Sequence, residues 1–173
     1  MKEECMQIET PRLLITRFTE DMAQSVHENS LDDDTRRFVP DEVFETVEIA
    51  RETIRFLISC YDQADMPLVY PVLLKDGQNI GYVQAVPLPD GTWEIGYHIG
   101  KKYTCQGYAT EAMRAFLPEV MRLLNISSIL GVCLKENIAS IKVLKRCGFA
   151  QTFEGTALYQ GAEREICCFL YRA

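Results

Sequence analysis

The chain has 173 residues, with 18 basic and 25 acidic side chains and a net charge of −7. A chain of this length can bury a sizeable core but is too short for two ordinary domains, so we expect a single domain over residues 1–173. The acidic balance disfavours broad contact with the phosphate backbone of nucleic acids, and no nucleic-acid partner is expected.

The seven cysteines follow no CxxC or zinc-finger spacing. An odd number of cysteines without such spacing fits a reducing compartment better than a disulfide scaffold. The start, Met1–Cys5, is charged and lacks the apolar core of a signal peptide, and no later run approaches the ~18 apolar residues of a membrane span. We therefore expect a cytoplasmic protein with no membrane partner and no bound metal.

The first third of the chain is expected to hold one strand and two helices. Arg12–Phe18 alternates as a strand does, and Thr19 then caps a helix that runs to about Glu28. The acidic stretch Asp32–Asp34 is expected to be a loop. Thr46 is placed to cap the second helix, whose apolar face consists of Val47, Ala50, Ile54, Leu57 and Tyr61.

Three strand-like segments follow: Leu68–Lys75, Ile80–Val86 and Trp93–Ile99. The short turns between them predict an antiparallel meander. The next strand, Ile129–Leu134, is separated from Trp93–Ile99 by a helix, and this order predicts a parallel pair with a crossover.

The crossover helix opens with a glycine turn, Gln106–Ala112. The first backbone NH groups of a helix have no intrahelical partner and lie at the positive end of its dipole, so they can hold a phosphate. Gly107 lets the backbone approach a ligand closely because it has no Cβ. The turn satisfies neither the dinucleotide-binding fingerprint nor the Walker pattern, so both of those nucleotide sites are excluded.

A second motif, Asn137–Phe149, follows the strand Ile129–Leu134. Asn137 is placed to cap a helix that Gly148 ends. Beyond it, Glu154-Gly155 and Gln160-Gly161 are expected to break the remaining chain into two strands.

Together these segments resemble the GCN5-related N-acetyltransferase (GNAT) superfamily, particularly the branch of the ribosomal-protein N-terminal acetyltransferases. The resemblance covers nearly the whole chain, and its four matching segments occur in the family's order: Glu9–Ile15, Glu94–Tyr97, Gln106–Ala112 and Asn137–Phe149. It implies an α/β fold with a mixed, mostly antiparallel sheet of about seven strands and helices on both faces. The fourth and fifth strands, Trp93–Ile99 and Ile129–Leu134, would form the acetyl-CoA cleft.

The resemblance also implies direct transfer of an acetyl group from acetyl-CoA, as co-substrate, to a primary amine. It places the pyrophosphate on backbone NH groups of the glycine turn and the pantetheine arm along the end of the fourth strand. The implied cofactor-binding residues are Ile99, Thr104, Cys105, Gln106, Gly107, Tyr108, Ala109, Thr110, Asn137 and Ser140. Thr104 departs from the superfamily pattern, which often has Gln or Arg at that position. Helix capping alone also explains Asn137.

Proton removal from the amine has two candidate bases. Period-two geometry puts Glu94, Gly96 and His98 on one face of the fourth strand, with Glu94 and His98 about 13 Å apart, so both cannot touch one amine. Glu94 matches the glutamate that relatives often use as a base. A buried glutamate can serve in this role because burial can raise the pKa of its carboxyl group towards neutrality. Its alternative role is a rim carboxylate that binds a cationic substrate. A structural role is favoured for His98.

The leaving thiolate has no evident acid. Many superfamily members carry a Tyr seven residues after the capping Asn, and here that residue is Leu144. Tyr97, Tyr103 or Tyr159 could substitute, although an aromatic packing role is favoured for each. A covalent route through Cys105 or Cys133 is disfavoured because no Cys, His and Asp set is recognisable.

The sequence leaves the acceptor open between a protein N-terminus, a lysine, a polyamine, an amino acid and a drug amine. The residues facing the acceptor are expected in the loops Asp32–Glu45 and Tyr159–Arg164. Acidic Asp32-Asp33-Asp34 and Asp41-Glu42 there could attract a cationic acceptor, but solvated loops are favoured for both. A monomer and a homodimer both remain open. The alternative function is a non-catalytic acyl-CoA-binding sensor or interaction module. This alternative stays open because Leu144 stands where many relatives have the Tyr.

Overall fold

The computed structural model describes residues 6–173, so the charged start Met1–Cys5 lies outside the described part. The strands are β1 Ile8–Glu9, β2 Leu13–Ile15, β3 Leu68–Leu74, β4 Asn79–Pro87, β5 Trp93–Ile99, β6 Ser128–Leu134, β7 Ala150–Tyr159 and β8 Ala162–Arg172. The helices are α1 Ala23–Ser30, α2 Asp33–Phe38, α3 Val47–Cys60, α4 Tyr108–Leu124 and α5 Ile138–Arg146. Short 3₁₀ turns η1 Glu20–Met22, η2 Pro40–Glu42 and η3 Lys101–Tyr103 join them.

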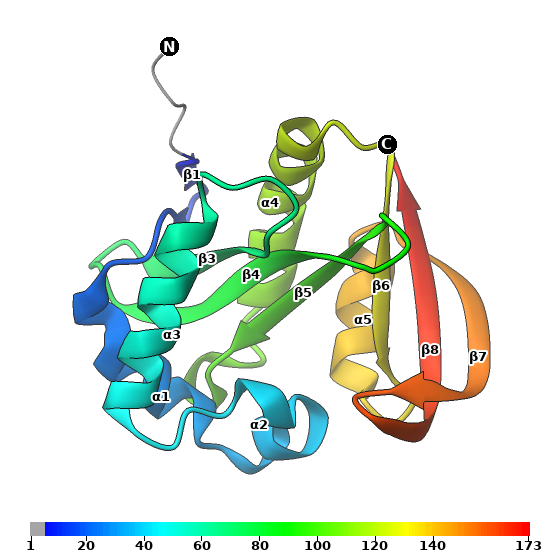
Figure 1. Cartoon of the computed structure of the whole chain (residues 1–173), viewed down its shortest axis with the longest axis horizontal. Coiled ribbons are helices and arrows are strands. Elements are labelled where there is room, and N and C mark those ends of the chain that lie inside the picture. Colours follow the sequence, from blue (N-terminus) through cyan, green and yellow to red (C-terminus); the bar gives the residue numbers. More distant parts are fainter. Residues whose placement is uncertain (1–5) are drawn as a thin grey trace.

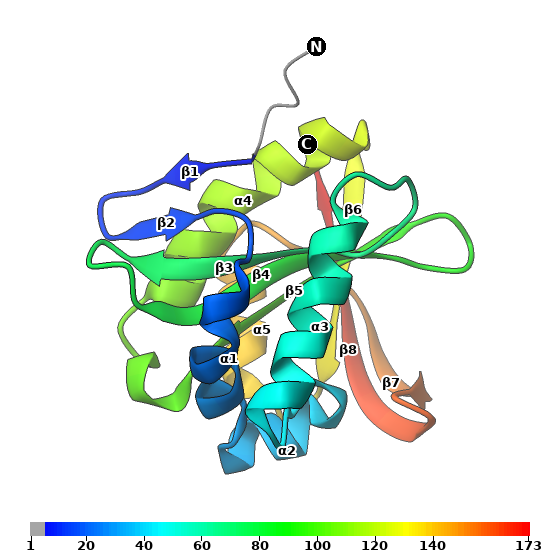
Figure 2. The ribbon, with the colours of Figure 1, turned by 60° about the vertical axis from the view of Figure 1, so that its left-hand side comes forward.

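The eight strands form one sheet in the order β1-β2-β3-β4-β5-β6-β8-β7. Every neighbouring pair is antiparallel except β5 and β6, which are parallel. Helices α1 and α3 cover one face, and α4 and α5 lie against the other (Figures 1 and 2). The predicted mixed, mostly antiparallel sheet with helices on both faces is thus confirmed, with eight strands in place of about seven.

The parallel pair holds together over a very short stretch. The register joins Glu94 to Leu130 and Ile95 to Gly131, and no further pair of residues on these strands is joined. Beyond Ile95 the two strands diverge towards α2, as Figure 1 shows. This splaying opens the sheet in its middle, at the carboxyl ends of β5 and β6.

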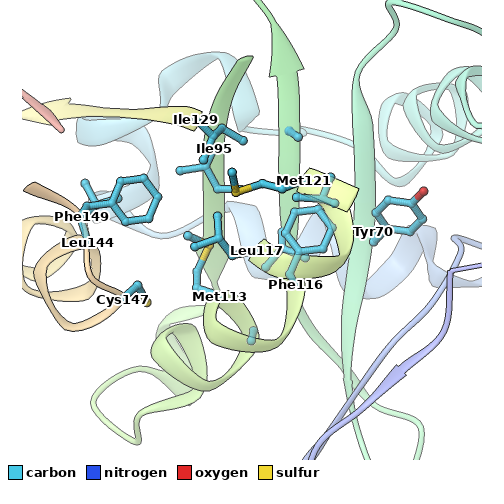
Figure 3. Close-up of a cluster of buried hydrophobic side chains, with 14 of the residues drawn as sticks. Tyr70, Ile95, Met113, Phe116, Leu117, Met121, Ile129, Leu144, Cys147 and Phe149 are labelled. Atoms are coloured by element: carbon cyan, nitrogen blue, oxygen red, sulfur yellow. The ribbon is translucent and has the colours of Figure 1, made fainter. Parts of the chain in front are cut away.

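A hydrophobic core beneath this opening fixes the two halves of the sheet to each other. Met113, Phe116 and Met121 of α4 share one buried cluster with Ile95 of β5 and Ile129 of β6, and Phe116 lies towards Tyr70 of β3 (Figure 3). All six side chains are almost fully buried. Such a contact keeps the splayed strands at a constant separation because a close-packed core resists shear.

Three predicted features were wrong in detail. The expected strand Arg12–Phe18 is shorter, and β1 pairs with β2 as a small hairpin that adds a strand at the sheet edge. Three α-helices, rather than two, separate β2 from β3. Glu154-Gly155 does not break the chain: Gly155 pairs with Ile166 inside β7, and the ring of Phe153 lies over it in place of a side chain.

The additional helix, α2, begins in the acidic stretch that was expected to be a loop. The carboxylate of Asp32 accepts hydrogen bonds from the backbone NH of Thr35 at 2.9 Å and from its hydroxyl at 2.8 Å, which caps the helix. Asp33 and Asp34 lie in the first turn and Arg36 and Arg37 in the last, so the charges complement the helix dipole. Local charge therefore stabilises a helix too short to show hydrophobic periodicity.

No helix within residues 6–173 is both long and apolar enough to span a membrane.

Candidate functional site

The opening between β5 and β6 contains two adjoining cavities. The first, of about 250 Å³, lies between the middle of β5, β6, the segment that follows α2 and the turn that joins β7 to β8. The second, of about 200 Å³, runs from the end of β5 towards the glycine turn that opens α4. Phe38, Val39, Tyr97, Asn137 and Ser140 line both, so the two cavities adjoin and together form the cleft between β5 and β6.

The first cavity is acidic. Asp41, Glu42 and Glu94 line it, and within the described residues no lysine, arginine or histidine does so. Both loops that were expected to face the acceptor contribute to it, through Phe38 to Glu42 and through Tyr159 and Gln160. A cavity with this lining is suited to a cation.

Two of these carboxyls have strongly shifted pKa values. Burial raises the pKa of Glu94 from 4.5 to about 7. Burial also raises the pKa of Glu42 from 4.5 to about 7; a hydrogen bond from Gln84 Nε2 to Glu42 Oε1, 3.1 Å long, opposes this rise, and the charges of Asp41 and Glu94 add to it. A carboxyl with a pKa near 7 can both accept and release a proton at neutral pH, which a general base requires.

These carboxyls predict a pH dependence of stability. Because the folded pKa of Glu42 lies above the ordinary 4.5, its stabilising contribution is full below about pH 4.5 and is lost as the pH rises through about 7. We expect Glu42→Gln, which cannot ionise, to match wild type near pH 5 and to exceed its free energy of unfolding by about 1–2 kcal/mol near pH 8.

Urea unfolding of both proteins at the two pH values measures this difference. Burial lowers the pKa of His98, which gives the opposite slope, but His98 is common to both proteins and cancels in the comparison. A stability difference that stays constant from about pH 5 to about pH 8 contradicts the expectation.

The second cavity gathers half of the predicted cofactor-binding residues. Its lining includes Ile99, Thr104, Ala109, Asn137 and Ser140. The first and second cavities meet at Tyr97. The Tyr97 hydroxyl donates to the carbonyl of Ser140 at 2.9 Å and lies 2.7 Å from Ser140 Oγ. Tyr97 therefore ties β5 to α5 across the cleft, and burial raises its pKa.

The other predicted cofactor-binding residues, Cys105, Gln106, Gly107, Tyr108 and Thr110, lie in the glycine turn itself. Cys105 has φ +61° and Gly107, the N-cap of α4, has φ +82°. Gly107 offers no side chain to cap the helix, so the first NH groups of α4 bond to no acceptor within the described residues. Free NH groups at a helix N-terminus are suited to an anion such as a pyrophosphate.

Arg12 braces this turn from the opposite side. Its Nη1 donates to the carbonyl of Gln106 at 2.9 Å, and its guanidinium lies 4.5 Å from the ring centre of Tyr108. Its Nε bonds to the carboxylate of Glu111 at 2.6 Å, and Thr10 Oγ1 donates to the same carboxylate at 2.7 Å. The segment that resembles the family's opening strand thus holds the turn in place.

His98 is held away from the first cavity. It lines the second, its Nε2 lies 2.7 Å from Thr35 Oγ1, and its ring stacks on Tyr82. Because the Thr35 hydroxyl donates to Asp32, it accepts from His98, which links β5 to the cap of α2. Glu94 and His98 do not share a cavity, in keeping with their separation along the strand.

Leu144 replaces the Tyr of many superfamily members with an apolar contact. It is buried, and a Cβ at Gly131 would lie 2.7 Å from its Cδ2, so α5 packs closely on β6 there. Tyr97 and Tyr159 line the first cavity, whereas Tyr103 lines neither. Cys133 lines the first cavity too, but burial raises its pKa to about 11, which disfavours a thiolate nucleophile.

Within the described residues, no group of three or more His, Cys, Asp or Glu side chains is arranged to hold a metal ion.

Comparison with known families decides the classification. The model of the GNAT acetyltransferase domain matches residues 12–150. The chain belongs to the GNAT family of acetyltransferases. A curated relative of this GNAT protein, the uncharacterised N-acetyltransferase YnaD of Bacillus subtilis strain 168, is 32% identical over 145 residues, which cover 83% of this chain and 82% of the relative.

Solved GNAT structures share the fold. An acetyltransferase of the family from Bacillus anthracis superposes with a TM-score of 0.81 at 25% identity, covering 96% of this chain and 98% of the other. RimL, a ribosomal L7/L12 alpha-N-protein acetyltransferase in complex with coenzyme A, gives a TM-score of 0.81 at 18% identity with the same coverage of both chains. The predicted recognition of this superfamily, and the prediction of an acyltransferase, are therefore confirmed.

The sequence did not indicate Gln84 as a residue of the GNAT cleft. It offered Glu42 only as the less favoured alternative to a solvated loop, and Gln160 only as part of the loop Tyr159–Arg164. Glu42 stands in one of two acidic stretches, and the pattern contains nothing that distinguishes it from Asp33 or Asp34, which remain exposed. The sequence held a weak signal for Gln84. This polar residue of β4 pairs with Gly96 of β5, and Gly96 has no side chain to cover Gln84.

Proposed function

We propose that this enzyme transfers the acetyl group of acetyl-CoA to the primary amine of a protein N-terminus or a small molecule. The observation that carries the proposal is the cleft of two adjoining cavities between β5 and β6. One end of it lies at the free NH groups of α4, and the other holds a carboxyl with a pKa near neutrality, Glu94. The two ends suit an anionic cofactor and a cationic acceptor, respectively.

In the proposed reaction the acceptor enters as an ammonium ion, and Glu94, directly or through a water molecule, removes one proton. The amine nitrogen then attacks the acetyl carbonyl carbon; the N–C bond forms and the C–S bond breaks. The nitrogen loses a second proton, and the thiolate of CoA takes up one proton as it leaves. The products are an acetamide and CoA, with one proton released to solvent through Glu94.

The protein's own groups support cofactor binding and the first proton transfer. Free backbone NH groups of the turn Thr104–Thr110 would hold the pyrophosphate. The edge of β5 beyond Ile95, where no strand pairs on the β6 side, leaves backbone groups near Ile99 to pair with the pantetheine amides. The side chain of Glu94 makes no hydrogen bond or ion pair within the described residues, so its carboxylate is available to the acceptor.

Calorimetric titration of the purified protein with acetyl-CoA, with ADP as the control for generic phosphate binding, tests the cofactor. A panel of primary amines scored by release of the CoA thiol tests the transfer. We expect binding selective for acetyl-CoA and acceptor-dependent release of CoA. Failure of the folded protein to bind acetyl-CoA would overturn the proposal, and binding without any acceptor-dependent release would favour the sensor.

A further inference from the structure

Two carboxylates from different elements converge on the first cavity. Glu42 ends the 3₁₀ turn η2, and Glu94 lies in the second position of β5. They are far apart in the sequence, yet the charge of Glu94 raises the pKa of Glu42. A pair of partly buried acids that line one cavity is costly unless a ligand compensates their charge.

A hydrogen bond from Gln84 holds Glu42 in this position. Gln84 and Gly96 face each other in the β4–β5 register, and the side chain of Gln84 crosses over Gly96. A Cβ on residue 96 would lie 2.6 Å from Gln84 Nε2. Because Gly96 leaves this space, Gln84 can donate to Glu42 Oε1, and within the described residues Glu42 Oε2 has no such partner.

A third acceptor lies in the same cavity. Gln160 donates its Nε2 to the carbonyl of Phe38 at 2.9 Å, and this bond fixes which end of the amide is the oxygen. Its Oε1 is buried and has no hydrogen-bond partner. Buried polar atoms without partners are rare, and the residue that carries this one lines the cavity, which marks Gln160 as a candidate partner for a ligand donor.

We propose that Glu42, Glu94 and the amide oxygen of Gln160 together recognise the acceptor as an ammonium ion that carries no anionic group near its amine. This inference rests on the proposed function and narrows its acceptor class. Three acceptor groups match in number the three N–H donors of a primary ammonium. A carboxylate on the acceptor would instead face Asp41, Glu42 and Glu94 in a cavity with no basic side chain in the described part of its lining.

Free amino acids are therefore poor acceptors, and their amides are good ones. Glu42 is the specificity-determining residue of this pair because Glu94 already serves as the proposed base. Removing the charge of Glu42 lowers the penalty for an anionic acceptor and weakens the hold on a cationic one. Discrimination between the two classes of acceptor should consequently fall.

The experiment compares acceptors that differ in one charge: 4-aminobutanamide with 4-aminobutanoate, and alaninamide with alanine. The value of kcat/KM for each, measured by CoA release, is compared between wild type, Glu42→Gln and Asp33→Asn. Asp33→Asn is the matched control, since it removes one acidic charge from the exposed start of α2, outside both cavities. The amide oxygen introduced by Glu42→Gln can still accept the bond from Gln84, so the variant keeps the local structure.

We expect wild type and Asp33→Asn to prefer each amide at least tenfold, and Glu42→Gln to reduce this preference to about threefold or less. Equal use of amides and acids by wild type, or an unchanged preference in Glu42→Gln, would overturn the inference while leaving acetyl transfer intact.

If no amine is acetylated, the proposed function fails and the inference is decided by binding. Calorimetric titration of the CoA-saturated protein with 4-aminobutanamide and 4-aminobutanoate then gives the result. Binding of the amide alone, lost in Glu42→Gln, supports cation recognition by this site. Equal binding of both compounds, or binding of neither, overturns it.

Discussion

Replacement of Glu94 by Gln is expected to lower kcat by about a hundredfold or more, the range for loss of a general base. The variant keeps the size of the side chain and removes its ability to accept a proton. Glu94 lines the first cavity and not the second, so the KM for acetyl-CoA should change little. Steady-state kinetics at saturating acetyl-CoA, followed by CoA release, measure both quantities.

The pH profile separates a base from a residue that only binds the acceptor. In wild type, kcat should rise with pH through an apparent pKa near 7, the value to which burial raises the pKa of Glu94. The variant should lose this rise. Glu163→Gln, an exposed acid on β8 outside both cavities, should behave as wild type. An unchanged kcat in Glu94→Gln would make Glu94 a rim carboxylate instead of the base.

Much of the fold could be predicted from short-range pattern. The strands β3, β4 and β5 could be predicted because turn residues separate their apolar runs. The N-terminal ends of α3 and α5 could be predicted because the side chains of Thr46 and Asn137 cap them. The parallel pair followed from one helix between two strands. Helix α2 could not be predicted from the sequence, because six residues are too few to show a hydrophobic period. The stability of α2 comes from its cap at Asp32 and from the charges in its first and last turns.

The cleft was predicted where backbone conformation decides it and missed where tertiary contacts decide it. Gly107 has a positive φ, a conformation that favours glycine, so the glycine itself indicated the turn in the sequence. The brace between Arg12 and Glu111 joins residues 99 positions apart, and no local pattern encodes such a pair. Glu42 is the same case: its carboxyl differs from those of its acidic neighbours only because the fold buries it beside Glu94.

Replacement of Gly107 by Val is expected to weaken acetyl-CoA binding about ten- to a hundredfold. Gly107 has φ +82°, a conformation that a β-branched residue adopts only with strain of about 1–2 kcal/mol or more. To relieve this strain the turn must move, which withdraws backbone NH groups from the pyrophosphate. A hydrogen bond to a charged group contributes about 1.5–3 kcal/mol, and each 1.4 kcal/mol is a factor of ten in the dissociation constant.

Gly91 supplies a matched control for this strain. Its φ is +84°, and a Cβ there would meet no atom within 4 Å, in a β4–β5 turn outside both cavities. Gly91→Val and Gly107→Val should therefore lose similar amounts of stability in urea unfolding, while calorimetry detects weakened acetyl-CoA binding in Gly107→Val alone. Equal affinities in the two variants would show that the turn before α4 does not hold the cofactor, because the two glycines have nearly the same φ. Gly107 differs in its place at the NH groups of α4 and in Arg12 Nη2, which would lie 3.4 Å from a Cβ there.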